Sequence, residues 1–199
     1  MKTSKRIIWL FILFTSICFN SNAQKSVVVS GSLPAVADSN LILQIDKNHM
    51  RRKMTSFNTI LHDNTFRLKF DVEKDYLVEL VNPAFRFPLF VSPGDSIVMT
   101  FVEKPLPTMD LKGKGSLENN FLQLFYTSFK DEFNDTISEK LALSNTVDAF
   151  EAKLFSQKKK LNDYFKADPN YSRFSENLKT FISNEISFNY WKQLFSYPI

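Results

Sequence analysis

"FPLFVSPGDSIVMTF", residues 87–101, contains two strand-like runs separated by Pro-Gly-Asp. Pro93 presets φ for the second position of a tight turn, and Gly94 accepts the positive φ that the third position of a type II turn requires. Asp95 and Ser96 can hydrogen-bond nearby backbone amides. A small polar site that cradles a ligand is the alternative. Because the turn accounts for every residue of the motif, the sequence favours two antiparallel strands joined by a turn.

Other segments on the N-terminal side of residue 116 alternate apolar and polar residues with a period of two. In residues 64–72, for example, Phe66, Leu68 and Phe70 share one face and charged or polar residues share the other. This alternation is typical of a half-buried strand. Seven such segments occur, at residues 25–33, 40–47, 55–61, 64–72, 75–81, 85–91 and 95–103. Short turns of Asp, Asn, Pro and Gly separate them, as antiparallel hairpins require.

The pattern becomes helical after residue 115, beyond which no glycine occurs. Apolar residues then recur at helical spacing in three segments, residues 116–133, 145–166 and 170–196. Ser116 and Asn145 are the predicted N-caps of the first two helices. Asp168 and Pro169 are predicted to start the third. The predicted fold class is therefore α+β, an antiparallel β-sandwich of about seven or eight strands followed by three α-helices.

The first 23 residues have the features of a secretory signal peptide. Positive residues precede an apolar run at residues 7–19, and a small-polar-small sequence ends at Ala23, just before Gln24. A transmembrane anchor is the alternative, but it needs roughly 20 apolar residues. The sequence predicts export across the inner membrane, cleavage before Gln24, no stable membrane span afterwards, and a location in the periplasm or cell envelope.

Cys18 raises the alternative of lipid attachment, which its large neighbour Ile17 disfavours. Cleavage after Ala23 removes this single cysteine, so the mature chain can form no disulfide and perform no thiol chemistry. The full chain has net charge +4, and residues 1–23 carry three positive and no acidic side chains, so the mature chain carries 4 − 3 = +1. This charge predicts no attraction to nucleic acid or anionic membrane.

The predicted organisation is a signal peptide at residues 1–23, an antiparallel β-domain at 24–113 and a helical region at 114–199. Motifs that carry chemistry are missing from the sequence. There is no C-x-x-C, no glycine-rich phosphate loop and no G-x-S-x-G, and His49 and His62 have no second ligand at metal spacing. The sequence predicts no cofactor, no metal and no catalytic activity of its own.

The segment KGKG at residues 112–115 can be interpreted in two ways. It can bind an anion at the N-terminus of the first predicted helix. It can also be a flexible connection from strand to helix, and the sequence favours this second interpretation.

The order of the Pro-Gly-Asp turn and a later G-x-G-x-x-x-N-x-x-L segment resembles the N-terminal region of Bacteroidota envelope thioredoxin-like thiol–disulfide oxidoreductases, the disulfide reductase family. The motif residues in this chain are Pro93, Gly94, Asp95, Gly113, Gly115, Asn119 and Leu122. In that family a β-rich domain of unknown function precedes helices, and the signal ending Asn-Ala-Gln is similar too. The resemblance covers roughly residues 25–199.

The chain departs from this family in the part that performs catalysis. The family's C-x-x-C lies in a thioredoxin-fold domain downstream, and this sequence ends at Ile199 without it. The resemblance therefore implies a non-catalytic accessory module whose partner is a thioredoxin-like domain, in cis or in trans, or another envelope protein. A truncated reading frame is favoured over a stand-alone relative. The alternative function is a secreted binding protein for a glycan or lipid fragment.

The last predicted helix carries apolar residues on more than one face. Phe181, Ile182 and Ile186 lie on one side, whereas Phe188 and Trp191 point toward another. Such a helix normally packs against more than one neighbour. The sequence therefore predicts an uncovered patch around Trp191 and Phe195, which is expected to mediate self-association or partner binding.

Overall fold

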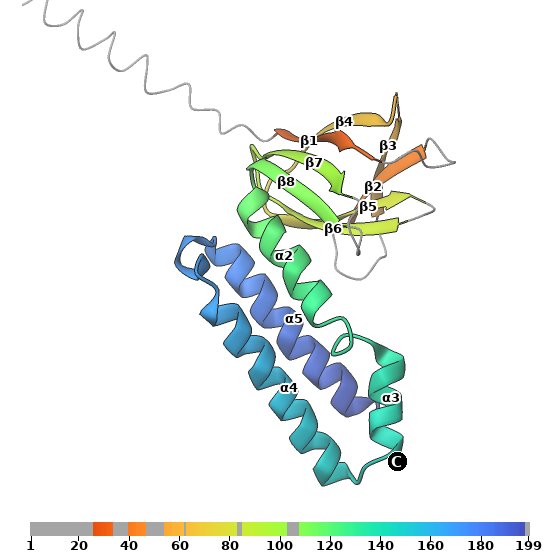
Figure 1. The fold of residues 1–199 in the computed structure, drawn as a ribbon, viewed down its shortest axis with the longest axis vertical. Helices are drawn as coiled ribbons and strands as arrows, with labels where there is room; N and C mark the ends of the chain where they lie inside the picture. The colour runs from red at the N-terminus through yellow and green to blue at the C-terminus, as the bar shows by residue number, and fades with distance from the viewer. Residues whose placement is uncertain are drawn as a thin grey trace, which may run out of the picture.

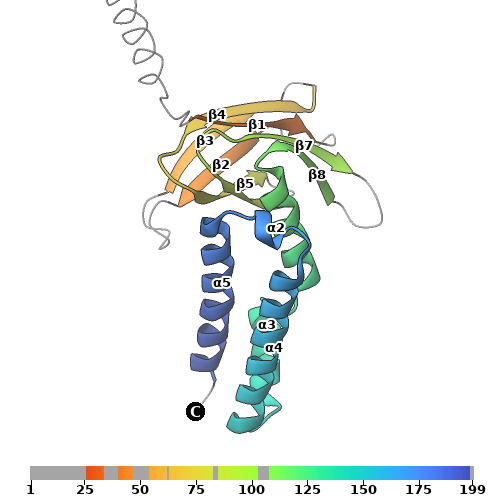
Figure 2. The ribbon, with the colours of Figure 1, turned by 90° about the vertical axis from the view of Figure 1, so that its left-hand side faces the viewer.

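The computed structural model describes residues 26–33, 40–46, 54–61, 63–82, 85–102 and 108–197. The predicted signal peptide with Cys18 and both histidines lie outside these ranges. A β-sandwich forms one end of the molecule, and a bundle of helices extends away from it (Figures 1 and 2). The α+β fold class predicted from the sequence is confirmed.

The described residues form two four-stranded sheets. The strands are β1 (Ser26–Ser32), β2 (Asn40–Asp46), β3 (Met54–Ile60), β4 (Thr65–Asp71), β5 (Tyr76–Asn82), β6 (Phe85–Val91), β7 (Ser96–Val102) and β8 (Thr108–Lys114). Sheet A has the order β4-β1-β7-β8, and sheet B has the order β3-β2-β5-β6. All neighbours are antiparallel except β1 and β7, which are parallel. Strand β8 is therefore an edge strand of sheet A, and β6 is an edge strand of sheet B.

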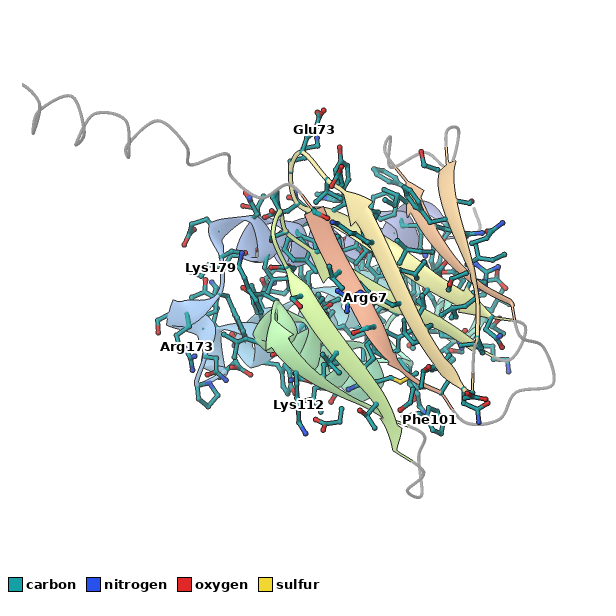
Figure 3. All side chains as sticks on the ribbon, turned by 90° about the horizontal axis from the view of Figure 1, so that it is seen from above. Arg67, Glu73, Phe101, Lys112, Arg173 and Lys179 are labelled. Atoms are coloured by element: carbon teal, nitrogen blue, oxygen red, sulfur yellow. The ribbon has the colours of Figure 1, made fainter. Side chains whose placement is uncertain are left out.

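The sandwich core forms because alternate side chains of both sheets point between them. In β4, for example, Phe66, Leu68 and Phe70 are buried and the intervening residues are exposed, as the period of two predicts. The outer face of sheet A is polar, with Arg67 and Lys112 pointing away from the core (Figure 3). Only one face of each strand is therefore buried in the sandwich core.

The eighth strand, β8, was not among the seven predicted segments. The prediction of a flexible connection at residues 112–115 was wrong, because residues 112–114 belong to β8 and pair with β7, with Ser96 opposite Lys114. Glycine has low β-propensity, which hides the strand in the sequence. Pairing with the apolar strand β7 orders it in the fold.

Four α-helices and one short 3₁₀ turn follow the sandwich in the described residues. They are α2 (Ser116–Ser128), α3 (Asp135–Leu143), α4 (Val147–Ala167), η1 (Tyr171–Arg173) and α5 (Glu176–Phe195). The three long helices lie within the three predicted segments, except that α4 ends at Ala167, one residue beyond the predicted end. The short helix α3 was not predicted as a separate element, and the first predicted helix ends at Ser128 rather than at residue 133.

The predicted N-caps of the first two helices were each wrong by one residue. Gly115 is the N-cap of α2, and Ser116 instead donates from its Oγ to the Gly113 carbonyl at 2.7 Å. Thr146 caps α4, whereas Asn145 donates from Nδ2 to the Leu141 carbonyl at 2.6 Å. In both cases the side chain that was predicted to cap the helix instead donates a hydrogen bond to a nearby backbone carbonyl.

The predicted start of the third helix was also wrong. Asp168 is the C-cap of α4, and its carboxylate accepts a hydrogen bond from the Asn170 amide at 2.7 Å. Ser175 caps α5, because its side chain accepts from the Leu178 amide. The residues between the two helices form the 3₁₀ turn η1.

A second core, rich in aromatic rings, joins the helices to the sandwich. Phe121 of α2 lies 5.4 Å from Phe165 and 4.9 Å from Phe174, measured between ring centroids. Phe90 of β6 points out of the sandwich and lies 5.9 Å from Phe181 of α5. The outer face of sheet B is therefore the surface on which the helices pack.

Candidate functional site

The Pro-Gly-Asp turn forms as the sequence predicts, but the prediction that it joins two paired antiparallel strands was wrong, because it connects β6 of sheet B to β7 of sheet A. Gly94 has φ 81°, and the Asp95 amide donates to the Ser92 carbonyl at 3.1 Å. The Asp95 side chain is only 5% exposed, and its Oδ2 accepts from the Ser92 amide at 2.8 Å. The Asp95 carbonyl also accepts from the Val28 amide at 2.9 Å. Asp95 therefore holds the turn closed and connects it to β1.

The two glycines after β7 fit tightly against this turn. Gly113 has φ 94°, and a Cβ atom there would lie 2.1 Å from the Ser96 carbonyl oxygen. Gly115 has φ 91°, and a Cβ atom there would lie 2.7 Å from Asp95 Oδ2. Contacts shorter than 3 Å leave no room for a side chain, so glycine is required at both positions. The G-x-G segment and the turn form one packed unit.

Asn119 attaches α2 to the edge of sheet B. It is 1% exposed, and its Oδ1 accepts from the Phe90 amide at 2.7 Å. Its Nδ2 donates to the Phe90 carbonyl at 2.7 Å and to the Gly115 carbonyl at 2.8 Å. Because β6 is an edge strand, the carboxamide pairs with it as a further strand would.

Gln123 makes the same contact with the edge of sheet A, and the sequence did not reveal it. Its Oε1 accepts from the Met109 amide and its Nε2 donates to the Met109 carbonyl, both at 2.8 Å. Asn120 adds a bond from Nδ2 to the Leu111 carbonyl at 3.1 Å. Helix α2 thus covers the edges of both sheets with three carboxamide side chains. We call Asn119, Asn120 and Gln123 the carboxamide clamp.

The structure brings together six of the seven motif residues that the sequence singled out, and the seventh, Leu122, is buried in the aromatic core of the helices. The six are Pro93, Gly94, Asp95, Gly113, Gly115 and Asn119. Their polar atoms are used by one another and by the backbone. Lys114 contributes as well, because its Nζ donates to the Gly94 carbonyl at 3.2 Å and lies 4.0 Å from Asp95 Oδ1. This arrangement is a structural junction between sandwich and helices.

Asp95 is the titratable group of this junction. Burial raises the pKa of its carboxyl group, whereas the Ser92 amide and the Lys114 ammonium act in the opposite direction. The folded protein therefore holds the Asp95 proton more tightly than the unfolded chain does. The stability contributed by this proton is complete below the unfolded pKa near 3.8 and is lost as pH rises through the folded value.

Comparison of the wild type with Asp95→Asn tests the direction of this pH dependence of stability. The amide keeps an acceptor for the Ser92 N–H but cannot ionise. We expect the free energy of unfolding of the wild type, relative to the variant, to increase as pH falls from 7 to about 4. Urea unfolding followed by circular dichroism at several pH values measures it. A relative stability that falls with decreasing pH would mean that Ser92 and Lys114 outweigh burial.

The second candidate feature is an exposed row of aromatic side chains on α5. Phe188 is 65% exposed, Trp191 48% and Phe195 81%. Their spacing of three and four residues places them on one face of the helix. The Trp191 and Phe195 rings stack at 5.8 Å between centroids. We call these three residues the aromatic face.

The opposite side of α5 is fully engaged in the bundle. Ile182 and Ile186 are buried in the helical core. Toward α2, the Tyr126 hydroxyl hydrogen-bonds to Glu185, and burial together with this carboxylate raises the pKa of Tyr126 well above its usual range. Helix α5 is therefore apolar on two sides, and only one of them is covered by described residues.

Two features are absent from the described residues, a group of metal-ligating side chains and a helix able to span a membrane. No three His, Cys, Asp or Glu side chains there are grouped to hold a metal ion. None of the helices in that part of the chain has the length and apolarity of a membrane span. Comparison with protein-family models, with curated proteins and with solved structures found no match to this chain.

Proposed function

We propose that this chain is a non-catalytic module of the cell envelope that binds a protein partner through the aromatic face of α5. The partner is a thioredoxin-like domain, in cis or in trans, as the resemblance to the disulfide reductase family implies. The observation that carries the proposal is the exposure of Phe188, Trp191 and Phe195.

The size of the aromatic face supports a binding role. A buried aromatic side chain removes 150–250 Å² from water, so the exposed fractions of these three residues amount to on the order of 400 Å². The largest apolar patch of a typical monomer has about this size and is often functional. Aromatic residues are also enriched at the centres of protein interfaces.

The junction supports the family resemblance from a different direction. Six of the seven motif residues are separated by up to 26 positions in sequence, from Pro93 to Asn119, yet they form one unit. A turn alone, or a helix start alone, recurs in many proteins for chemical reasons. In this junction the Asp95 carboxylate of the turn packs into the space that is free because Gly115 has no Cβ. Such a fit between two segments is a more specific feature.

The double substitution Trp191→Ser and Phe195→Ser tests the proposal. The probe is a purified thioredoxin-like envelope domain from the same organism, titrated by calorimetry into residues 24–199. We expect binding to weaken by at least about ten-fold, because interface aromatics commonly contribute more than 1 kcal/mol each. Circular dichroism should change little, since both side chains are already exposed.

Phe155→Ser provides the matched control. Phe155 is 62% exposed on α4, outside the aromatic face, so its replacement removes one exposed aromatic side chain from a different surface. We expect this variant to bind like the wild type. Equal affinities for the wild type and the double variant would contradict the proposed function.

A further inference from the structure

The exposed side of α5 is not covered by another helix of the described residues. Figure 2 shows α5 on one side of the bundle, with α2, α3 and α4 on the other. Six residues follow this side at alternating intervals of four and three, namely Asn177, Phe181, Asn184, Phe188, Trp191 and Phe195. Five of them are exposed, and Phe181 is half-buried against Phe90 of β6. We call these six residues the α5 row.

The spacing of the α5 row is that of a coiled-coil seam. Alternation of three and four residues keeps side chains on one line along a helix, and a second helix covers this line in a coiled coil. The row extends from residue 177 to residue 195, which is about 27 Å of helix. A different row, with Leu178, Ile182 and Ile186, packs in the helical core. Helix α5 therefore has two packing rows, and the described fold covers one of them.

The α5 row is uncharged, and the charges elsewhere on α5 are already paired within the chain. The pairs are Glu176 with Lys179, Lys192 with Asp135, and Glu185 with Tyr126. Thr180 and Ser187, which flank the row, are uncharged as well. An identical row therefore brings no like charge against this one, so a second copy of α5 can approach it without repulsion.

Helix α4 shows that an uncharged exposed side is not a general property of this bundle. Its exposed residues include Glu151, Lys159, Asp163 and Lys166. Helix faces that meet water normally carry charged and polar residues in this way. The contrast indicates that the exposed side of α5 is built to meet protein rather than water.

The sizes of the side chains in the α5 row match those of a second copy running in the opposite direction. The layers of an antiparallel pair centred on residue 186 are Asn177 with Phe195, Phe181 with Trp191, and Asn184 with Phe188, each occurring twice. Most layers then combine a large ring with a smaller asparagine, which fills the space between helices evenly. A parallel pair would instead place Trp191 against Trp191 and asparagine against asparagine.

The area available on α5 is that of a reversible dimer. The aromatic face contributes on the order of 400 Å² from each copy, or about 800 Å² for two copies. The smaller side chains of the row add to this area. Specific interfaces bury about 1,200–2,000 Å² in total, so this one lies at the lower end of the range, where complexes are weak and transient.

We propose that the α5 row pairs with the α5 row of a second copy of this chain to form an antiparallel, two-fold symmetric dimer. Each copy contributes the same surface, as in other two-fold dimers. This inference rests on the proposed function and specifies its regulation. The dimer covers Phe188, Trp191 and Phe195, so the thioredoxin-like partner binds only after the second copy has left.

Sedimentation equilibrium of residues 24–199 tests the dimer. We expect a monomer–dimer equilibrium with a dissociation constant on the order of 10–100 μM. Trp191 is the single tryptophan of residues 24–199, so its fluorescence should shift to shorter wavelength as the dimer forms. A chain that stays monomeric up to about 1 mM would overturn the inference without affecting the proposed binding of a partner.

Two substitutions of Asn184 should change the dimer in opposite directions. Asn184→Leu should tighten it at least about ten-fold, because a polar asparagine in a helix seam lowers stability. Asn184→Glu should weaken it at least about ten-fold, because each carboxylate is placed against Phe188 of the other copy. Ser156→Glu, at an exposed position of α4, is the matched control and should behave like the wild type. Equal dissociation constants for both Asn184 variants would overturn the inference.

Crosslinking through single cysteines tests the antiparallel direction. Residues 24–199 contain no cysteine, so each introduced thiol is unique. In the antiparallel dimer the two copies of Ser187 lie about 3 Å apart along the helix axis, and the two copies of Asn177 about 27 Å apart. A short thiol-specific crosslinker should therefore join Ser187→Cys efficiently and Asn177→Cys poorly. Equal crosslinking of the two variants would contradict the antiparallel arrangement.

Titration with the thioredoxin-like domain tests the competition between the two occupants. About one fifth of the chain is monomeric at ten times the dimer dissociation constant, so the apparent affinity for the domain should be about five-fold weaker there than in dilute solution. Equal affinities at both concentrations would contradict the competition. Failure of the domain to bind at either concentration would contradict the proposed function, whereas the dimer is measured without any partner.

Discussion

Replacing Asn119 with leucine is expected to lower the free energy of unfolding by about 3–5 kcal/mol. Leucine has a similar size but no polar atoms. The substitution leaves the Phe90 amide and the Phe90 carbonyl without their partner, whereas the Gly115 carbonyl keeps the bond from the backbone amide of residue 119 at 3.4 Å. Each buried group left unpaired costs about 1–3 kcal/mol. Urea unfolding of residues 24–199, followed by circular dichroism, measures the change.

Asn120→Leu is the control for this experiment. Asn120 is the adjacent carboxamide of the same helix, it is partly buried, and it makes one bond at 3.1 Å to Leu111. We expect a loss of about 1 kcal/mol. Similar losses for Asn119→Leu and Asn120→Leu would show that pairing with the β6 edge is not what stabilises the junction.

Gly115→Ala is expected to destabilise the protein by about 2–4 kcal/mol. Its φ of 91° is unfavourable for alanine, and the new Cβ would lie 2.7 Å from Asp95 Oδ2. The methyl group must push Asp95 away from the Ser92 amide. Thermal and urea unfolding of the variant measure the loss.

A double-mutant cycle tests whether the contact between the new Cβ at position 115 and the Asp95 side chain causes the loss of stability. In Gly115→Ala with Asp95→Ala, the second substitution removes the clash, so the combined loss should be smaller than the sum of the two single losses. Gly113→Ala serves as the contrast, because its clash at 2.1 Å is with the Ser96 backbone carbonyl. Removing the Asp95 side chain cannot relieve that contact. Strict additivity for Gly115 and Asp95 would contradict the proposed packing.

The strands could be predicted wherever their pattern is set by burial on one face. Strand β4 alternates without interruption, and the turn at Pro93 and Gly94 follows from backbone preferences alone. Strand β8 could not be predicted, because it contains Gly113 and is ordered by its pairing with β7. Helix α3 was missed since its separation from α2 depends on tertiary contacts of the connection, including Glu132.

The candidate sites were predictable to different degrees. The motif residues of the junction were found as a turn and a helix start, but their contact across the two segments depends on the strand register that sets Ser96 opposite Lys114. Gln123 was missed because it bonds to the backbone of Met109, and a bond to the backbone does not depend on which side chains the sequence contains there. Trp191 and Phe195 were found, because apolar residues on two faces of one helix are visible in the sequence.

The carboxamide clamp has a consequence for the newly made chain. Strands β6 and β8 precede α2 in sequence, so both emerge from the ribosome before Asn119 and Gln123. Until those side chains arrive, the two edges expose unpaired peptide groups that can recruit strands from other chains. At about 5–20 residues per second, this interval lasts on the order of seconds. Association through these edges is therefore expected mainly during that interval, before α2 has folded onto both of them.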